Sequence, residues 1–184
     1  TCTGTCTGGN STILYFNKSS YSCQQKGSQF YKFNASDNSS SATNISDDLG
    51  PYEFTLIRDS VEFINPQGNG GTVNRSGNQN ISLAIRINDT TKGVLVTSNV
   101  TAGRFWITYD DNNWDDGSAN KSTNSSSYMN YVFNPNCSSP RYNASSSQKW
   151  KVGVLNDECY ADTNSSVNYT LTIRGDLKNA IVLP

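Results

Sequence analysis

The sequence predicts an all-β protein built as an antiparallel β-sandwich, because three observations agree. Short runs rich in Val, Ile, Thr, Tyr and Phe recur between clusters of Gly, Asn, Ser and Asp. Two runs, at 81–87 and 167–174, alternate between apolar and polar residues, which is typical of antiparallel strands with one wet face. The sequence shows no sustained 3.6-residue period and contains a single Met, so little favours helices.

Eleven segments are expected to form strands. In chain order they are residues 13–16, 30–33, 52–57, 61–64, 81–87, 93–97, 104–109, 128–133, 149–155, 167–174 and 180–183. So many short strands favour a sandwich of the jelly-roll or immunoglobulin-like kind over a barrel. We expect a Cys-rich N-terminal segment or joint at 1–28 and the β-sandwich domain at 29–184.

The apolar faces of these strands define the expected core. Its members are Phe54, Leu56, Phe63, Ile81, Leu83, Ile85, Val94, Val96, Phe105, Ile107, Trp150, Val152, Val154, Tyr169, Leu171 and Ile173. A one-residue shift of a strand would exchange its two faces, so an independent check of register is useful. Asn168 falls on the polar face of its run, and Asn80 shares the parity of Ser82. Both asparagines belong to the glycosylation motif considered next.

The motif Asn-x-Ser/Thr, which directs N-glycosylation in secreted proteins, is unusually frequent. By chance, 24 Asn and 43 Ser plus Thr among 184 residues would produce about 6 such sequons. The chain contains fifteen: Asn10, Asn17, Asn34, Asn38, Asn44, Asn74, Asn80, Asn88, Asn99, Asn120, Asn124, Asn136, Asn143, Asn164 and Asn168. We therefore expect a densely glycosylated extracellular protein, secreted or at the cell surface, with glycans supplying the solubility that few charges provide.

Composition argues against several functions. The chain has no His, so neither a Ser-His-Asp nor a Cys-His catalytic arrangement is possible. Charged residues make up 16% of the chain, the net charge is −1, and the Lys and Arg residues are scattered, which disfavours nucleic acid as a partner. No apolar run approaches the length of a membrane span. We expect a protein that is not an enzyme, with no catalytic residues and no cofactor apart from N-linked glycans.

Five cysteines suggest disulfides in an extracellular setting. The simplest pairing keeps the two sequence clusters separate, joining Cys137 to Cys159 and Cys6 to Cys23. The odd cysteine, for which Cys2 is the best candidate, would then be free or bonded to a partner outside this chain. The opening Thr-Cys-Thr-Gly-Thr-Cys-Thr-Gly-Gly looks like the Cys/Gly-rich tail of a small module, which favours a missing upstream segment or an intermolecular bond.

One acidic cluster stands out after the strand expected at 104–109. It contains Asp110, Asp111, Asp115 and Asp116, with Trp114 among them and Gly117 at its end. The simplest interpretation is a solvated turn. A calcium loop using Asp111, Asn113 and Asp115 is a second. A site for sugar or substrate, with Trp114 as the stacking platform, is a third.

Residues 148–174 carry a family resemblance. They read Lys-Trp-Lys-Val-Gly-Val-Leu-Asn, then a polar loop, then Asn-Tyr-Thr-Leu-Thr-Ile. This resembles the last two strands of the pre-peptidase C-terminal type of β-sandwich. The resemblance implies a non-catalytic accessory or adhesive module of extracellular proteins, and it brings no catalytic residue with it.

Two apolar segments, at 13–16 and 180–184, contrast with the sequon-rich remainder. They are either edge strands of the same sandwich or strands donated to a neighbouring copy. Head-to-tail donation would generate a filament. We therefore expect a structural subunit of an extracellular filament, sheath or surface coat, whose partners are copies of itself. The alternative is an adhesion or carbohydrate-binding module of a larger secreted protein, with possible glycan contacts and calcium; a glycosidase using the Asp cluster is a more distant third.

Overall fold

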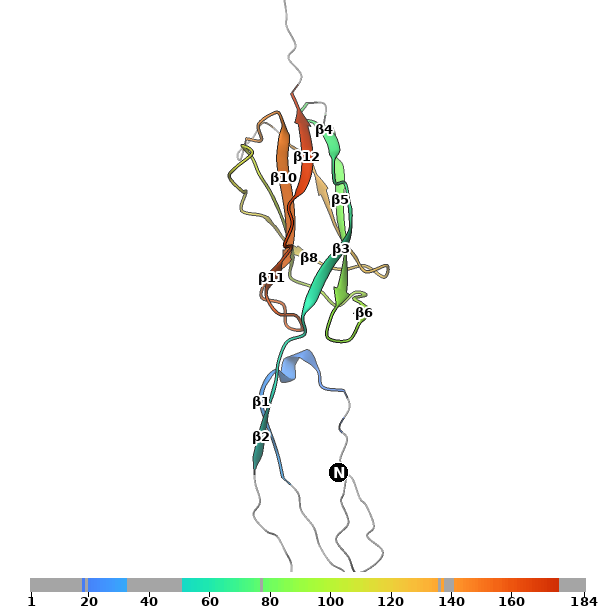
Figure 1. The fold of residues 1–184 in the computed structure, drawn as a ribbon, viewed down its shortest axis with the longest axis vertical. Coiled ribbons are helices and arrows are strands. Elements are labelled where there is room, and N and C mark those ends of the chain that lie inside the picture. Colours follow the sequence, from blue (N-terminus) through green and yellow to red (C-terminus); the bar gives the residue numbers. More distant parts are fainter. Residues whose placement is uncertain are drawn as a thin grey trace, which may run out of the picture. The chain divides into compact units, whose positions relative to one another are not determined.

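The computed structural model describes residues 18, 20–32, 51–76, 78–135, 137 and 141–175, and it divides the chain into two compact units. These are Thr1–Ile57 and Arg58–Pro184. Both are built from β-strands, and the described residues contain one short 3-10 helix, η1 (Cys23–Gln25), and no α-helix (Figure 1). The expected all-β fold with packed sheets is confirmed.

The first unit contains a two-stranded antiparallel sheet. Its strands are β1 (Gly27–Tyr31) and β2 (Tyr52–Leu56), with Gly27 opposite Leu56 and Tyr31 opposite Tyr52. The Tyr31 and Tyr52 rings stack with centroids 5.3 Å apart, a cross-strand contact that stabilises the pair. We expected these strands inside the sandwich and a boundary near residue 28. Instead they pair with each other, and the division between units falls after Ile57.

The second unit contains a six-stranded sheet. Five strands follow one another in the order β4 (Gly71–Asn74), β12 (Tyr169–Arg174), β10 (Ser145–Val154), β7 (Gly103–Ile107) and β8 (Ser118–Lys121). The short β11 (Thr163–Asn164) also pairs with β10. Neighbours are antiparallel except β12 and β4, which run parallel.

A four-stranded sheet forms the other layer. It consists of β3 (Val61–Gln67), β5 (Ile81–Asp89), β6 (Val94–Leu95) and β9 (Tyr128–Phe133), and every partner of β5 is antiparallel to it. The chain moves from β3 to β4, and so from one sheet to the other, through a turn at Gly68. Gly68 has φ +83°, and a Cβ there would lie 2.7 Å from the Ser82 carbonyl oxygen, so glycine is required. β4, which follows this turn, runs parallel to β12, against the expectation of a purely antiparallel fold.

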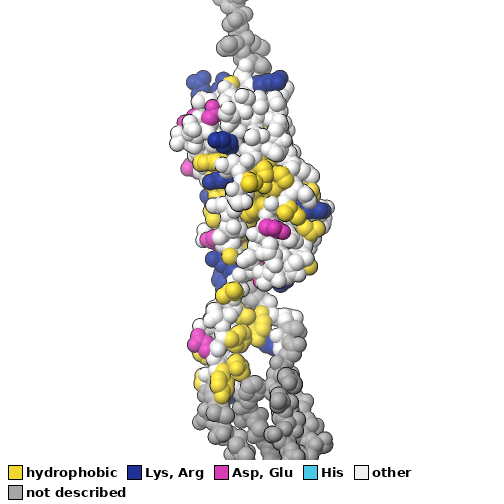
Figure 2. Space-filling view, viewed as in Figure 1, with side chains coloured by type: hydrophobic (Ala, Val, Ile, Leu, Met, Phe, Trp, Pro, Cys, Tyr) yellow, Lys and Arg dark blue, Asp and Glu magenta, His cyan; other side chains and the backbone are white. Residues whose placement is uncertain are grey.

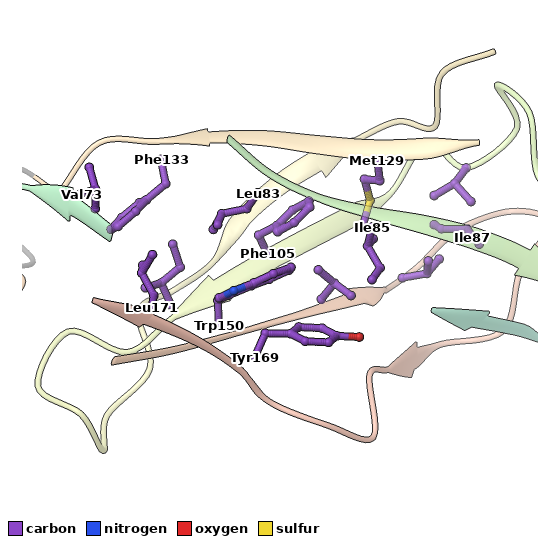
Figure 3. Close-up of a cluster of buried hydrophobic side chains, with 14 of the residues drawn as sticks. Val73, Leu83, Ile85, Ile87, Phe105, Met129, Phe133, Trp150, Tyr169 and Leu171 are labelled. Carbon is purple, nitrogen blue, oxygen red and sulfur yellow. The ribbon is translucent and has the colours of Figure 1, made fainter. Parts of the chain in front are cut away.

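The core lies between these two sheets (Figure 3). A chain of aromatic rings runs through it, from Tyr169 to Trp150 (4.4 Å between centroids), then Phe105 (6.0 Å) and Tyr131 (5.7 Å). The step from Phe105 on β7 to Tyr131 on β9 crosses from the six-stranded to the four-stranded sheet. Burial of these rings supplies a large part of the hydrophobic free energy of folding.

Most of the expected core is observed. Fully buried members are Leu83, Ile85, Val96, Phe105, Ile107, Trp150, Val152, Val154, Tyr169, Leu171 and Ile173. Phe63 and Ile81 are half-buried against the core, whereas Phe54 and Leu56 belong to the other unit. Val94 is 52% exposed, so its assignment was wrong. The strand expected around it shrinks to Val94–Leu95, since the preceding residues form the turn after β5.

Replacing Trp150 by Ala should lower the free energy of unfolding by about 3–5 kcal/mol, because it removes a fully buried ring from the middle of the aromatic chain. Urea or guanidinium unfolding followed by circular dichroism measures this. Val132→Ala is the control, since Val132 is 61% exposed and the change should stay within about 0.5 kcal/mol. Equal effects of the two substitutions would contradict the assigned core.

Candidate functional site

Nine of the fifteen sequon asparagines lie in the described part of the chain, and none of those nine is buried. Seven are exposed: Asn80, Asn99, Asn120, Asn124, Asn143, Asn164 and Asn168. Asn74 and Asn88 are half-buried. The other six, Asn10, Asn17, Asn34, Asn38, Asn44 and Asn136, lie outside the described residues.

An N-linked glycan is attached to the side-chain nitrogen Nδ2 of Asn. These asparagines differ in whether Nδ2 is already engaged in a hydrogen bond. Asn124 accepts hydrogen bonds at Oδ1 from the backbone N–H groups of Ser126 (2.9 Å) and Tyr128 (3.0 Å), which leaves Nδ2 out of the turn. Asn88 instead donates from Nδ2 to Glu62 Oε1 at 2.9 Å. Asn88 is half-buried and its Nδ2 is already engaged, so we expect it to be a poor acceptor for a glycan.

The acidic cluster forms the hairpin between β7 and β8. Asp110 Oδ1 accepts hydrogen bonds from the backbone N–H groups of Asn112 (3.2 Å) and Asn113 (2.6 Å). A further hydrogen bond from the Asn113 side chain to Oδ2 is the main reason that the pKa of Asp110 is lowered. An isolated bridge between Thr108 and Trp114 closes the hairpin. Asp110 thus organises a turn, as the simplest interpretation of the sequence had it.

Asp115 ties this hairpin to neighbouring segments. Its Oδ1 accepts from the backbone N–H groups of Ile107 and Gly117, both at 3.0 Å, and its Oδ2 accepts from the Tyr142 hydroxyl at 2.8 Å. Burial, together with this bond to Asp115, raises the pKa of Tyr142, so the hydroxyl remains a donor across the physiological range. Both oxygens of Asp115 are committed to structural hydrogen bonds.

The three residues expected to bind calcium have different surroundings. Asp111 Oδ2 accepts from the Ser145 hydroxyl at 2.9 Å, while its Oδ1 is buried with no hydrogen-bond partner. Asn113 is exposed and engaged with Asp110, and Asp115 is satisfied as described. Over the described residues, no three side chains of the His, Cys, Asp and Glu types are grouped so as to hold a metal ion.

Two tryptophans lie on the outer side of the six-stranded sheet, with a lysine between them. Lys151 Nζ is 4.5 Å from the centroid of the Trp114 ring and 5.5 Å from that of Trp106. Trp106 packs so closely over Gly117 and Gly153 that a Cβ on either would approach its ring to 2.7 and 3.0 Å. Trp106 was not singled out from the sequence, because an aromatic residue inside a strand is more often part of the core.

Charge is sparse elsewhere on this unit. On the face of Arg58–Pro184 seen in Figure 2, Lys and Arg side chains are scattered, and hydrophobic side chains form a patch. This distribution agrees with the scatter of basic residues in the sequence.

The described part of the chain contains no helix that is long and apolar enough to cross a membrane.

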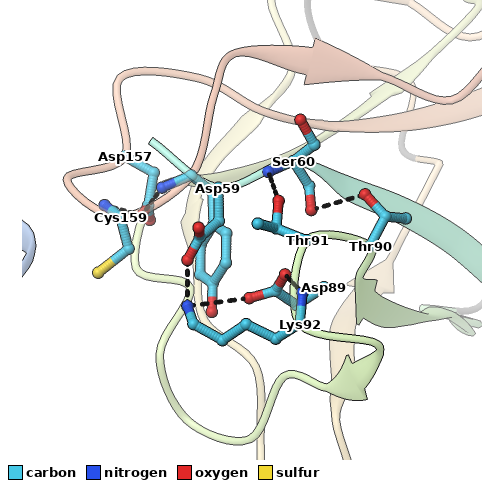
Figure 4. A network of polar contacts seen from close by, with 9 residues as sticks. Asp59, Ser60, Asp89, Thr90, Thr91, Lys92, Asp157 and Cys159 are labelled. Atoms are coloured by element: carbon cyan, nitrogen blue, oxygen red, sulfur yellow. Dashed lines mark hydrogen bonds and ion pairs between the residues drawn. The ribbon is translucent and has the colours of Figure 1, made fainter. Parts of the chain in front are cut away.

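Polar contacts in the second unit connect the residues around Asp59, the turn after β5 and the segment at Asp157–Cys159 (Figure 4). Asp157 is 1% exposed, and its carboxylate accepts from the backbone N–H groups of Thr101 (2.9 Å), Ala102 (3.2 Å), Cys159 (2.9 Å) and Tyr160 (3.2 Å). Near it, Lys92 forms ion pairs with Asp59 and with the buried Asp89. Neither cluster was identified from the sequence, where buried carboxylates have no periodic signature.

The cysteines pair differently from the expectation. Cys23 and Cys159 are each disulfide-bonded, whereas Cys137 is an exposed free thiol. The predicted Cys137–Cys159 bond is therefore wrong, whereas the Cys6–Cys23 bond stays a prediction because Cys6 is not among the described residues. The prediction favoured bonds within each sequence cluster, but disulfides require close Cα atoms in space and not in sequence. Cys2 and Cys6 lie outside the described residues, as do the apolar segments 13–16 and 180–184.

Comparison with known proteins found no matching family model, curated protein or solved structure. The resemblance to the pre-peptidase C-terminal type of module at 148–174 therefore stays a prediction.

Asp157→Ala should destabilise the protein by about 3 kcal/mol, because it leaves several buried backbone N–H groups without an acceptor. The exposed Asp116 is the matched control, and Asp116→Ala should change the free energy of unfolding by less than about 0.5 kcal/mol. Thermal and urea unfolding of both variants provide the comparison. A cost for Asp157→Ala as small as the control's would show that these hydrogen bonds are not structural.

Proposed function

We propose that this protein is a non-catalytic structural glycoprotein, a subunit of an extracellular filament, sheath or surface coat. Glycans cover its exterior, and its terminal segments form the joints between copies. The observation that carries the proposal is the placement of the sequons. Seven of the nine described sequon asparagines are exposed and none is buried, although β5 and β12, which begin directly after Asn80 and Asn168, bury large apolar side chains.

The exposed sequons are spread over the second unit. Asn80 precedes β5, Asn120 lies on β8, Asn164 on β11, and Asn168 precedes β12. They therefore border strands of both sheets. A coat of glycans over both layers would leave little bare surface for a substrate cleft, and it would shield the protein from proteases. Both consequences suit a structural subunit better than an enzyme.

The sheet edges provide places where a neighbour's strand can pair. Among the described strands, β4 pairs with β12 alone and β3 with β5 alone. Asn65 in β3 has φ +51° and is followed by Pro66, which lacks an N–H group, so this edge is a poor template for pairing. β4 contains no proline and is the better acceptor for an added strand.

The donor in this proposal is the apolar C-terminal segment 180–184, and the segment 13–16 is the second candidate. Both consist largely of residues that favour strands, and neither contains a sequon. Donation from one copy to the next is a heterologous contact that does not close, so it builds a linear polymer.

Val182→Pro tests this joint, because proline removes a backbone donor and cannot pair within a sheet. The wild-type protein should form head-to-tail polymers, visible by electron microscopy and by sedimentation velocity, and Val182→Pro should shift it to monomers. Val182→Thr, which keeps β-branching, is the matched control and should still assemble. A wild-type protein that remains a monodisperse monomer at high concentration would contradict the proposal.

A carbohydrate-binding or adhesion module is the second candidate, favoured by the pair Trp106 and Trp114. Their rings, bridged by Lys151, bring aromatic side chains together on the outer side of a sheet, and sugars commonly stack on aromatic rings. This function needs no polymer and would operate in a monomer.

Titration with a panel of oligosaccharides, with and without calcium, tests the second candidate. Trp114→Ala should weaken binding by about 1 kcal/mol, while Val132→Ala, at an exposed position on β9, should leave it unchanged. No measurable binding by the wild-type protein would remove this candidate.

A further inference from the structure

Asp59 lies just after the boundary between the two units, and both its backbone N–H group and its carbonyl oxygen are hydrogen-bonded. Its N–H group donates to the Cys159 carbonyl oxygen at 2.9 Å, and its own carbonyl oxygen accepts from the Ala161 N–H group at 2.8 Å. Asp59 and Tyr160 form an isolated parallel bridge. The position of this carboxylate is therefore set by main-chain contacts with a segment distant in sequence.

Lys92 lies in the turn that follows β5, and its backbone is also fixed by a hydrogen bond. Its N–H group donates to Asp89 Oδ1 at 2.9 Å. The same turn is attached to Ser60, the residue after Asp59: the Thr90 N–H group donates to the Ser60 carbonyl oxygen at 2.9 Å, and the Ser60 N–H group donates to Thr91 Oγ1 at 3.1 Å. Lys92 and Asp59 thus meet across two segments that are fastened together.

The side chains complete a three-residue arrangement (Figure 4). Lys92 Nζ pairs directly with Asp59 Oδ2 and lies 3.3 Å from Asp89 Oδ2. The Asp59 and Asp89 side chains are 24% and 2% exposed, so one carboxylate beside the amine is almost completely removed from water. Tyr160, which is 4% exposed, has its pKa raised mainly by burial and further by the charge of Asp89.

We propose that Lys92 and Asp59 form an intramolecular isopeptide bond, with Asp89 carrying the proton. The hydrogen bond that Lys92 donates to the Asp59 carboxylate raises the pKa of Lys92, so the reaction starts from an ammonium and a carboxylate. Asp89 accepts one proton from the ammonium, and the Nζ lone pair attacks Asp59 Cγ. The C–O bond to one carboxylate oxygen then breaks. That oxygen takes the proton from Asp89 and a second proton from Nζ, and it leaves as one water molecule.

The reaction is balanced without another reagent, because one positive and one negative charge disappear together. Amide formation is unfavourable between separate molecules in water, but groups held in contact react with effective concentrations of about 10⁵ M or more. A buried carboxylate placed within 3.3 Å of the amine is suited to proton transfer, which typically contributes about 100-fold or more to the rate. Lys92 is 59% exposed, which leaves a path for the released water.

The bond would protect the pairing of β3 with β5. Asp59 precedes β3, and Lys92 follows β5, whose Asp89 lies opposite Val61. Tension applied through the chain at Arg58 would otherwise separate these strands from that end. An isopeptide bond at this point passes the tension directly to the turn after β5. The inference does not depend on assembly, although such a crosslink suits a subunit under tension.

The test is a tryptic digest of the reduced and alkylated full chain, produced in a host that adds no N-glycans. The isopeptide bond would block cleavage after Lys92 and join the peptide 59–75 to the peptide 87–104. The joined species should weigh one water molecule less than its two parts. Normal cleavage after Lys92 in the wild-type protein, with no joined peptide, would overturn the proposal.

Substitutions of Lys92, Asp89 and Asp59 test the role of each residue in forming the bond. Lys92→Arg keeps the charge but should abolish the joined peptide, whereas Lys121→Arg should leave it intact. Asp89→Asn should slow its formation by about 100-fold, and an unchanged rate would remove Asp89 from the mechanism. Asp59→Asn should produce the same joined peptide with loss of ammonia instead of water. Because these readouts are covalent masses, failure here leaves the assembly proposal standing, and failure of assembly leaves the crosslink standing.

Discussion

The structure depends on one constraint, the alternation of side chains along each strand, which decides what faces the core and what faces water. On β5, Leu83, Ile85 and Ile87 are buried, while Ser82 and Asn88 lie on the other side. On β12, Tyr169, Leu171 and Ile173 are buried in the same way. Because the two inner faces meet in one aromatic core, a one-residue shift in either strand would bury polar groups and expose the core at once.

The same alternation connects the fold to the proposed function. A glycan on Asn cannot enter a packed interior, so a chain with many sequons needs strands whose outward positions are reliably outward. Asn168 and Asn80 sit at the starts of the two most regular strands and are exposed. Polar groups that do lie inside, such as Asp157 and Gln148, are satisfied by hydrogen bonds. The interior is therefore kept for packing and the exterior for glycans.

The fold class and most of the core follow from the sequence, because alternation is a local signal that needs no knowledge of tertiary structure. What could not be predicted depends on contacts between distant segments. β4 has four residues and pairs in parallel with β12, about a hundred positions away, so no local pattern marks it. The strand β2, which contains Phe54, has the alternation expected of a sandwich strand, but it pairs with β1 instead. The Asp59–Lys92–Asp89 cluster likewise joins segments whose proximity only the fold creates.

Site-resolved glycopeptide mass spectrometry of the protein from its native source tests whether glycans cover the second unit. We expect glycans on the exposed asparagines Asn80, Asn99, Asn124 and Asn168, and lower occupancy at Asn88, whose Nδ2 is bonded to Glu62. Unmodified asparagines throughout the second unit would contradict a glycan-covered structural protein. So would full occupancy at Asn88 with none at the exposed sites, because accessibility would then have no bearing on where the sugars are.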